Sequence, residues 1–221
     1  MKINGDKCKI LSQDGKDVTI DSTVVEKVTQ FNFLGSTIPG TTTDVEKRLA
    51  MAYASFGRLS RNVWTNRNFS TKLKLRLLYA LIYPIATYAC STWTLTKKDT
   101  NKLRVFENNC LRKILGIKLI DRVSIQKLHE KAGSLPVIVN HVKKQRLQWF
   151  GHVMRMEDNS LAKKIMKNDF QKKRKRGRPP KRWIDQLKED TGLSIPTLDT
   201  LAADRIVWRR KVNTEWAKSQ R

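Results

Sequence analysis

The spacing of apolar side chains predicts a mainly α-helical chain that begins with a short extended region. Residues 1–42 contain β-branched and aromatic residues between turn signals at Asp14-Gly15 and Pro39-Gly40, a composition typical of short strands and a hairpin. From Thr43 onward, apolar residues recur every three or four positions, which is the period of an amphipathic helix. The pattern therefore predicts a small N-terminal β region followed by a series of helices.

Helix boundaries are predicted from residues that satisfy the free backbone groups at helix ends. Expected starts are the capping box Thr43-Asp44-Val45-Glu46 and the hydroxyl residues Ser70, Thr96 and Ser124, and expected stops are Gly116, Gly133 and Gly192. Pro84 has no backbone N–H to donate, so it should kink or restart the second helix. Further helices are expected over residues 137–156, 161–169, 183–190 and 198–216.

The predicted core follows the same periodicity. The helix that starts at Thr96 should bury a stripe made of Leu103, Phe106, Cys110, Leu111 and Ile114. Six tryptophans are each expected to anchor a small helical core: Trp64, Trp93, Trp149, Trp183, Trp208 and Trp216. Helical pattern vanishes and charge density rises over residues 168–180, which predicts a division of the chain there.

The charge of the chain indicates the chemical class of its partner. Lysine and arginine number 45 against 20 aspartates and glutamates, and the resulting net charge of +25 is spread along the whole chain. Such a charge predicts strong, salt-sensitive attraction to nucleic acid. A membrane protein would need a long uninterrupted apolar segment, an amphipathic helix with a continuous cationic face or a lipidation signal, and the sequence contains none of these. We therefore expect RNA or DNA as partner and no membrane.

The densest positive charge lies in a basic strip, residues 172–182. Eight of its eleven residues are cationic: Lys172, Lys173, Arg174, Lys175, Arg176, Arg178, Lys181 and Arg182. Gly177, Pro179 and Pro180 do not favour a helix, so the strip should be extended and suited to a polyanion. Its centre has the form of an AT-hook, in which arginines enter the narrow minor groove of A·T-rich DNA. A nuclear-import signal or a solvated linker is the alternative interpretation.

Two predicted helices carry further candidate phosphate contacts. These are Lys72, Lys74 and Arg76 on one helix and Lys143, Lys144 and Arg146 on the other. The second group is interleaved with Trp149, Phe150 and His152, and aromatic rings can stack on bases while cations hold phosphates.

The sequence offers no catalytic or metal-binding constellation. Asp44 and Glu46 suit helix-start positions, and Asp185 and Glu189 should pair with the adjacent basic strip rather than bind a metal ion. His129, His141 and His152 lack metal-ligand spacing, and Cys8, Cys90 and Cys110 form neither a zinc motif nor a disulfide framework. We expect no metal, no cofactor and no small-molecule substrate.

An ordered series of motifs resembles one protein family. Phe31-Asn32-Phe33-Leu34-Gly35-Ser36 is similar to the F-x-Y-L-G-S motif that follows the active site of non-LTR (LINE-type) retrotransposon reverse transcriptases. Further similar stretches follow in the same order at residues 52–59, 64–67, 88 with 93–95, 110–116, 146–156 and 177–183. The resemblance covers nearly the whole chain.

The resemblance implies that different regions of the chain have different roles. Lys7 corresponds to a palm-end lysine that assists the leaving pyrophosphate, and Phe31, Phe33, Leu34 and Gly35 correspond to the primer grip. The implied regions are a palm-end and primer-grip-like β region (1–42), a thumb-like helical region (43–116), a post-thumb helical region (117–170), and a basic linker with C-terminal helices (171–221).

The departures from the family limit what the chain does alone. Polymerisation needs carboxylates that place two metal ions, and these 221 residues contain no Asp-Asp pair. Cys8 stands where the family usually has threonine. We expect a nucleic-acid-binding C-terminal part of a reverse transcriptase that does not polymerise alone, located in the nucleus or in a cytoplasmic ribonucleoprotein, with the reverse-transcriptase core as a possible second partner. The alternatives are a nuclear DNA-binding protein that acts through the AT-hook-like motif and an inert transposon remnant.

Overall fold

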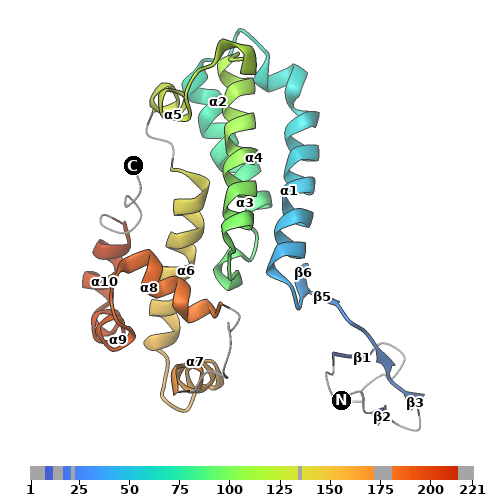
Figure 1. Cartoon of the computed structure of the whole chain (residues 1–221), viewed down its shortest axis with the longest axis vertical. Coiled ribbons are helices and arrows are strands. Elements are labelled where there is room, and N and C mark those ends of the chain that lie inside the picture. Colours follow the sequence, from blue (N-terminus) through green and yellow to red (C-terminus); the bar gives the residue numbers. More distant parts are fainter. Residues whose placement is uncertain (1–7, 12–16, 21–22, 134–135, 172–180, 214–221) are drawn as a thin grey trace. The chain divides into compact units, whose positions relative to one another are not determined.

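Helices dominate the structure, a computed structural model that describes residues 8–11, 17–20, 23–133, 136–171 and 181–213 (Figure 1). The expected mainly α fold with short N-terminal strands is confirmed. Contacts between residues divide the chain into two compact units, Met1–Lys47 and Arg48–Arg221. None of the helices in the described part is both long and apolar enough to cross a bilayer.

The described residues of the first unit form three short two-stranded ladders. Strand β1 (Lys9–Ile10) pairs in parallel with β4 (Glu26–Lys27), while β2 (Thr19–Ile20) with β3 (Thr23–Val24) and β5 (Phe31–Phe33) with β6 (Ser36–Ile38) are antiparallel pairs. The β5–β6 hairpin turns at Leu34 and Gly35, whose φ angles of 48° and 83° are the left-handed values that a tight hairpin turn needs. The hairpin expected from the sequence is therefore present.

Helix α1 (Thr41–Arg58) begins two residues before the predicted capping box. The Asp44 N–H donates to the Gly40 carbonyl at 3.2 Å, so Thr43 lies inside the first turn and the predicted cap at Thr43 is wrong. Asp44 is a first-turn acid, as predicted, and its Oδ1 accepts from the Thr37 N–H at 3.2 Å. This bond joins the hairpin to the helix, a non-local role that the local sequence pattern does not reveal.

The second unit continues as a succession of helices. These are a π-helical turn (Ser60–Trp64), α2 (Thr71–Leu77), a second π-helical turn (Leu78–Ile82), α3 (Tyr83–Ala86), a 3-10 turn (Cys90–Thr92), α4 (Lys97–Leu115), a 3-10 turn (Leu119–Asp121), α5 (Ile125–Ala132), α6 (Ile138–Met154), α7 (Leu161–Gln171), α8 (Trp183–Thr191), α9 (Ile195–Ala203) and α10 (Arg205–Lys211). Several predicted boundaries are confirmed. Ser70, Thr96 and Ser124 cap α2, α4 and α5, and Gly116 and Gly192 end α4 and α8 with left-handed backbone.

Two interruptions shape the helical series. The hydrogen bonding of α2 changes to a π-helical pattern before Pro84, and α3 restarts with Pro84 in its first turn, as expected for a residue without a backbone donor. The single helix predicted over residues 198–216 is wrong, because the structure has two helices separated at Asp204. The Asp204 carboxylate accepts from the N–H groups of Ile206 and Val207 at 2.8 and 3.0 Å and so starts α10 as its N-cap.

Helix α4 is central to the first helical core and contacts α2, α5 and α6 (Figure 1). Its predicted stripe is confirmed, since the following side chains are 0 to 6% exposed: Leu103, Phe106, Cys110, Leu111 and Ile114. Trp64 and Trp93 are also buried, at 1 and 2% exposed, which confirms their anchoring roles.

A buried carboxyl on α4 joins three helices. Glu107 is 1% exposed, and its Oε1 accepts from the Tyr83 hydroxyl at 2.5 Å and from the Ile138 N–H at 2.9 Å. Val137 supplies no side-chain cap to α6, so Glu107 satisfies that helix start from outside. Its Oε2 has no hydrogen-bond partner. Burial raises the pKa of Glu107 to about 7, although Tyr83, Ile138 and Arg104 lower it.

The raised pKa of Glu107 predicts a pH-dependent stability. The folded protein holds the Glu107 proton up to about pH 7, whereas the unfolded chain loses it near the ordinary value of 4.5. The unfolded state therefore binds fewer protons in this window, and the free energy of unfolding should fall by about 3 kcal/mol as the pH rises through it. Glu107→Gln should remove this component, as measured by urea unfolding at about pH 5 and about pH 7.5. An unchanged difference between the two pH values in the variant would contradict the assignment.

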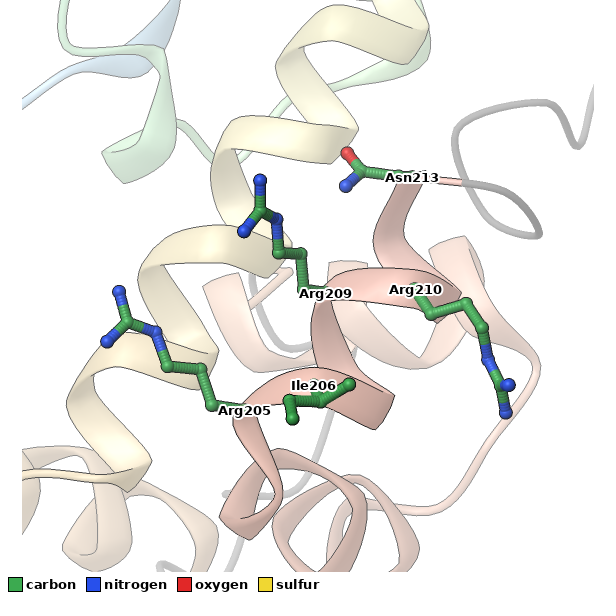
Figure 2. Close-up of a pocket in the computed structure, with 5 residues that line it drawn as sticks. All are labelled: Arg205, Ile206, Arg209, Arg210 and Asn213. Carbon is green, nitrogen blue, oxygen red and sulfur yellow. The ribbon is translucent and has the colours of Figure 1, made fainter.

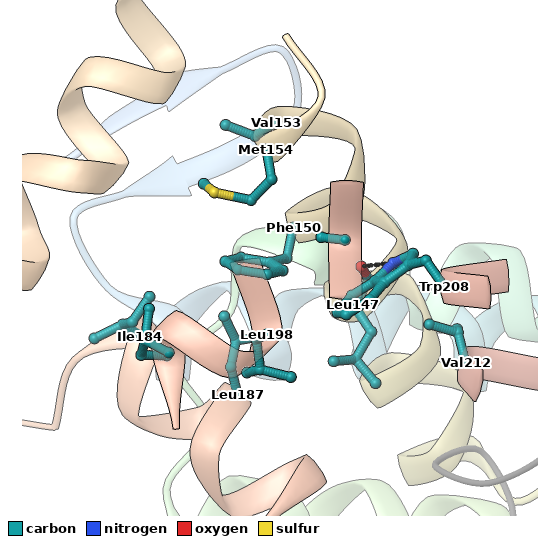
Figure 3. Close-up of a cluster of buried hydrophobic side chains, with 11 residues drawn as sticks. Leu147, Phe150, Val153, Met154, Ile184, Leu187, Leu198, Trp208 and Val212 are labelled. Atoms are coloured by element: carbon teal, nitrogen blue, oxygen red, sulfur yellow. Dashed lines mark hydrogen bonds between the residues drawn. The ribbon is translucent and has the colours of Figure 1, made fainter. Parts of the chain in front are cut away.

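A second core lies between α6 and the C-terminal helices α8, α9 and α10 (Figure 3). It is formed by eleven buried side chains: Leu147, Phe150, Val153, Met154, Ile184, Leu187, Ile195, Leu198, Ala202, Trp208 and Val212. Residues before and after the segment 168–180 share this cluster, so the helices on its two sides are joined through apolar contacts. The four regions expected from the sequence stay predictions of functional organisation.

Helices α6 and α10 approach closely in this core at Gly151 and Trp208. The Trp208 Nε1–H donates to the Leu147 carbonyl at 3.1 Å (Figure 3). A Cβ atom added at Gly151 would lie 2.5 Å from Trp208 Cδ1 and 2.9 Å from Cε2, distances at which the indole or the helix must shift. Gly151 therefore permits α10 to pack at its observed position against α6.

Gly151→Ala should accordingly destabilise the protein. We expect a loss of roughly 1–3 kcal/mol in the free energy of unfolding, because the added methyl group overpacks a filled core. The matched control is Gly57→Ala, since Gly57 lies in α1 with no atom within 4 Å of the added Cβ. That control should stabilise the protein by roughly 0.5–1 kcal/mol. Chemical denaturation of both variants measures the two values, and equal effects would contradict the role of Gly151.

Candidate nucleic-acid interface

Positive side chains gather in a cleft between α6 and α10. The cleft, named here the α6–α10 cleft, has a volume of about 390 Å³ and is lined by Lys144, Gln148, Arg155, Arg205, Trp208, Arg209, Val212 and Asn213. A second, more open hollow of about 560 Å³ adjoins it, lined by Arg205, Ile206, Arg209, Arg210 and Asn213 (Figure 2). Figure 2 shows Arg205 and Arg209 extending toward α6 and Arg210 extending away from it.

Helical spacing explains why these cations face one another. Arg205 and Arg209 are four residues apart and lie on one side of α10, because residues at this spacing are neighbours on a helix surface. Lys144 on α6 and Arg155, the residue that follows α6, are eleven residues apart. Eleven residues make about three helical turns, so both side chains lie on the same side of α6. Within the described residues, none of the four forms an ion pair with a carboxylate.

The pKa of Arg155 is sensitive to the positive charge of the cleft. Its Nη1 donates to the Ala202 carbonyl at 2.8 Å, near the C-terminal end of α9, where a cation is favoured by the helix dipole. Burial, and secondly the charge of Arg205, lower the pKa of Arg155, although an arginine remains protonated at physiological pH. A bound anion would relieve the repulsion between the two arginines. The arrangement suits a phosphate or another polyanion rather than a cationic or apolar ligand.

The carboxylates of the described residues are mostly committed to other roles. Four of them accept from backbone N–H groups at or near helix starts: Asp99, Asp121, Asp185 and Asp204. Asp44 accepts from the Thr37 N–H of β6. Glu107 and Asp190 are buried. Lysine and arginine outnumber aspartate and glutamate by 45 to 20, and most of the described cations are exposed, so the surface carries the excess positive charge. No group of three or more metal-ligating side chains occurs in the described part of the chain.

The structure separates the predicted phosphate-contacting residues into exposed and buried sets. Lys72 and Arg76 are exposed on α2, and Lys144 lies in the α6–α10 cleft. Lys74 and Lys143 are each 8% exposed and Arg146 is 1% exposed. The contact role predicted for these three side chains is corrected, because a buried cation cannot reach the phosphates of a large polyanion.

Arg146 is the centre of a buried ion-pair network. Its Nη1 donates to Asp190 Oδ2 from α8, and its Nη2 donates to the Trp93 carbonyl at 3.4 Å. Lys143 Nζ lies 3.7 Å from Asp190 Oδ1. One acid thus balances two cations of α6 and fixes α8 against it. The sequence pattern does not indicate this ion pair, because Asp190 is 44 residues from Arg146 along the chain.

The remaining predicted residues lie in three places. Lys181 Nζ pairs with Glu189 at 2.6 Å and Arg182 Nη2 with Asp185 at 3.7 Å, which confirms the expected pairing between α8 acids and the end of the basic strip. Phe31, Phe33, Leu34 and Gly35 form the β5–β6 hairpin, with Phe33 and Leu34 55 and 77% exposed. Lys7 and the strip residues Lys172, Lys173, Arg174, Lys175, Arg176 and Arg178 lie outside the described residues.

Three cations of the cleft were not predicted from the sequence as phosphate contacts: Arg155, Arg205 and Arg209. A sequence signal for two of them exists. Arg205 and Arg209 flank Trp208 at a spacing that places a buried ring on one side of a short helix and two guanidinium groups on another. No local pattern indicates that this helix lies beside Lys144.

The buried ion pair predicts a large effect of a single charge removal. Asp190→Asn should lower the free energy of unfolding by roughly 3–5 kcal/mol, because it leaves Arg146 buried without a counter-charge. The control is Glu189→Gln, which removes the exposed pair with Lys181 and should cost at most about 1 kcal/mol. Thermal or urea unfolding compares the two, and equally small effects would contradict the network.

Comparison with known proteins supplies one relative. The chain is 27% identical over 228 aligned residues to a transposon-derived protein of Caenorhabditis elegans, and the match covers 94% of this chain and 81% of that protein. No family profile matches the sequence, and no solved structure is significantly similar. A match of this length over nearly the whole chain is evidence of common descent. The chain is therefore a helical protein of transposable-element origin and a distant homologue of this transposon-derived protein.

Proposed function

We propose that this protein is a nucleic-acid-binding region derived from the C-terminal part of a non-LTR retrotransposon reverse transcriptase. The ordered motifs from Phe31 to Trp183 support the reverse-transcriptase origin, and the transposon-derived relative is consistent with it. The chain binds RNA or DNA through its backbone phosphates, with little dependence on base sequence, in the nucleus or in a cytoplasmic ribonucleoprotein.

The α6–α10 cleft is the observation that carries the proposal. Its four cations face one another across two helices with no ion-paired carboxylate in the described part of the structure. Like charges held together in this way cost free energy unless an anion occupies the space between them. A nucleic-acid strand supplies a series of such anions at regular spacing, and each neutralised phosphate releases counterions.

The chain acts in binding rather than in catalysis. Phosphoryl transfer by a polymerase needs a set of carboxylates that holds two metal ions. Many of the described acids are caps, buried partners or exposed members of ion pairs, and the sequence has no Asp-Asp pair. We propose that the chain does not polymerise by itself and that a reverse-transcriptase core is its second partner.

Charge removal in the cleft tests the proposal. The triple variant Lys144→Gln, Arg205→Gln, Arg209→Gln should weaken binding at roughly 0.1 M salt by at least about tenfold and lower the slope of log affinity against log salt by about 2 to 3. The measurement is fluorescence anisotropy with labelled RNA and labelled duplex DNA over a range of salt concentrations.

The matched control removes the same charge elsewhere. Lys98, Lys113 and Lys131 are exposed on α4 and α5, and their replacement by Gln should change the slope much less. Equal losses of affinity in the two triple variants would contradict a role for the cleft.

Two further outcomes would favour the alternative functions. A·T-selective binding that is lost in Arg176→Ala with Arg178→Ala would favour the AT-hook alternative. Absence of salt-sensitive binding to both nucleic acids would contradict the proposed function and favour an inert remnant.

A further inference from the structure

Helix α6 exposes a continuous face beside the cleft. Successive residues of a helix are rotated by about 100°, so Trp149 lies about 140° around α6 from Lys144, and His152 lies between them at about 80°. All three side chains are at least partly exposed. The α6 face therefore has cations at the edge next to α10 and an aromatic pair at the opposite edge.

Trp149 is the most exposed of the described tryptophans, so the core-anchoring role predicted for it is wrong. Its side chain is 40% exposed, whereas Trp64, Trp93 and Trp208 are at most 2% exposed and serve the cores. The Trp149 ring packs on the imidazole of His152, with ring centroids 5.6 Å apart and planes inclined at 41°. This contact holds the indole at the surface and leaves part of it open to solvent, where a second ring can stack on it.

We propose that the α6 face binds a single-stranded nucleic acid, with a backbone phosphate in the α6–α10 cleft and a base stacked on Trp149. The inference rests on the proposed function and specifies the form of its ligand. Lys144 and Trp149 are separated by about 9 Å across a helix about 10 Å wide and by about 7.5 Å along its axis, which together give about 12 Å. A strand that crosses the helix covers this separation with the sugar and phosphate groups of one or two nucleotides. Base stacking on an aromatic side chain then adds to the attraction of the phosphates.

The chemistry of the aromatic edge favours a single strand over a duplex. In a duplex the faces of the bases stack on one another and are not open to a protein ring, so contact with Trp149 would require unstacking at a cost of a few kcal/mol. In a single strand the base faces are already accessible. The cations of the cleft bind phosphates of either form, so discrimination between single strand and duplex depends on Trp149.

The test combines a protein variant with a modified ligand. Trp149→Ala and Trp149→Phe are measured by fluorescence anisotropy against a labelled single strand of about 12 nucleotides, its duplex, and an abasic strand that keeps every phosphate. Trp149→Ala should weaken binding of the single strand by at least about fivefold and leave duplex and abasic strand within about twofold. Trp149→Phe, which keeps an aromatic ring, should retain most of the affinity. Parallel RNA and DNA strands show whether the sugar matters.

Several outcomes would overturn the inference, and each differs from failure of the proposed function. Equal weakening of single strand, duplex and abasic strand by Trp149→Ala would show that the indole does not stack on bases. If Trp149→Ala changes the affinity for none of the three ligands while binding stays salt-sensitive, Trp149 is not part of the binding site. The proposed function would not be contradicted by that result. Circular dichroism confirms folding of the variants. Arg209→Gln provides an internal comparison, because it should weaken all three ligands and lower the salt slope by about 1.

Discussion

The close packing of Trp208 on Gly151 is the contact on which the cationic cleft depends. Because Gly151 has no side chain, the indole reaches the backbone of α6 and donates to the Leu147 carbonyl. This contact fixes α10 beside α6, and Arg205 and Arg209 of α10 then stand opposite Lys144 and Arg155. The apolar cluster beneath them stabilises an arrangement that the repulsion between the cations opposes.

A second constraint is the placement of aspartate and glutamate side chains at helix starts and in the protein interior. Carboxylates at helix starts satisfy backbone donors, and two buried acids, Glu107 and Asp190, join helices that are distant in the sequence. Burial of Glu107 and Asp190 removes two carboxylates from the surface, whereas Asp121 and Asp204 remain exposed. The excess of lysine and arginine therefore becomes a surface property, and the same residues that stabilise the helices leave the exterior suited to a polyanion.

Features that depend on neighbouring residues, such as helix starts and buried stripes, were predicted from the sequence. Features that depend on residues distant in the sequence, such as buried ion pairs and the cleft, were not. The start of α4 follows from Thr96 and Asp99, which cap it within one turn, and its buried stripe follows from helical spacing. The burial of Arg146 and Lys143 could not be predicted, because a run of cations on a helix is consistent with exposure until a distant acid is brought beside it. The break at Asp204 was missed because apolar spacing continues across it, although an aspartate is a strong N-cap. The cleft was missed because its two sides come from different helices.

The charged surface and the helical scaffold are the features that support the proposed role in holding a nucleic-acid strand. Contact mapping by ultraviolet cross-linking decides where that strand lies. A single-stranded RNA that contains 4-thiouridine would be irradiated with the protein, and the cross-linked peptides identified by mass spectrometry. Cross-links should concentrate on residues 144–155 and 205–209 and decrease as salt is raised. Cross-links confined to α2, α4 or the basic strip, with none on α6 and α10, would contradict binding at this face.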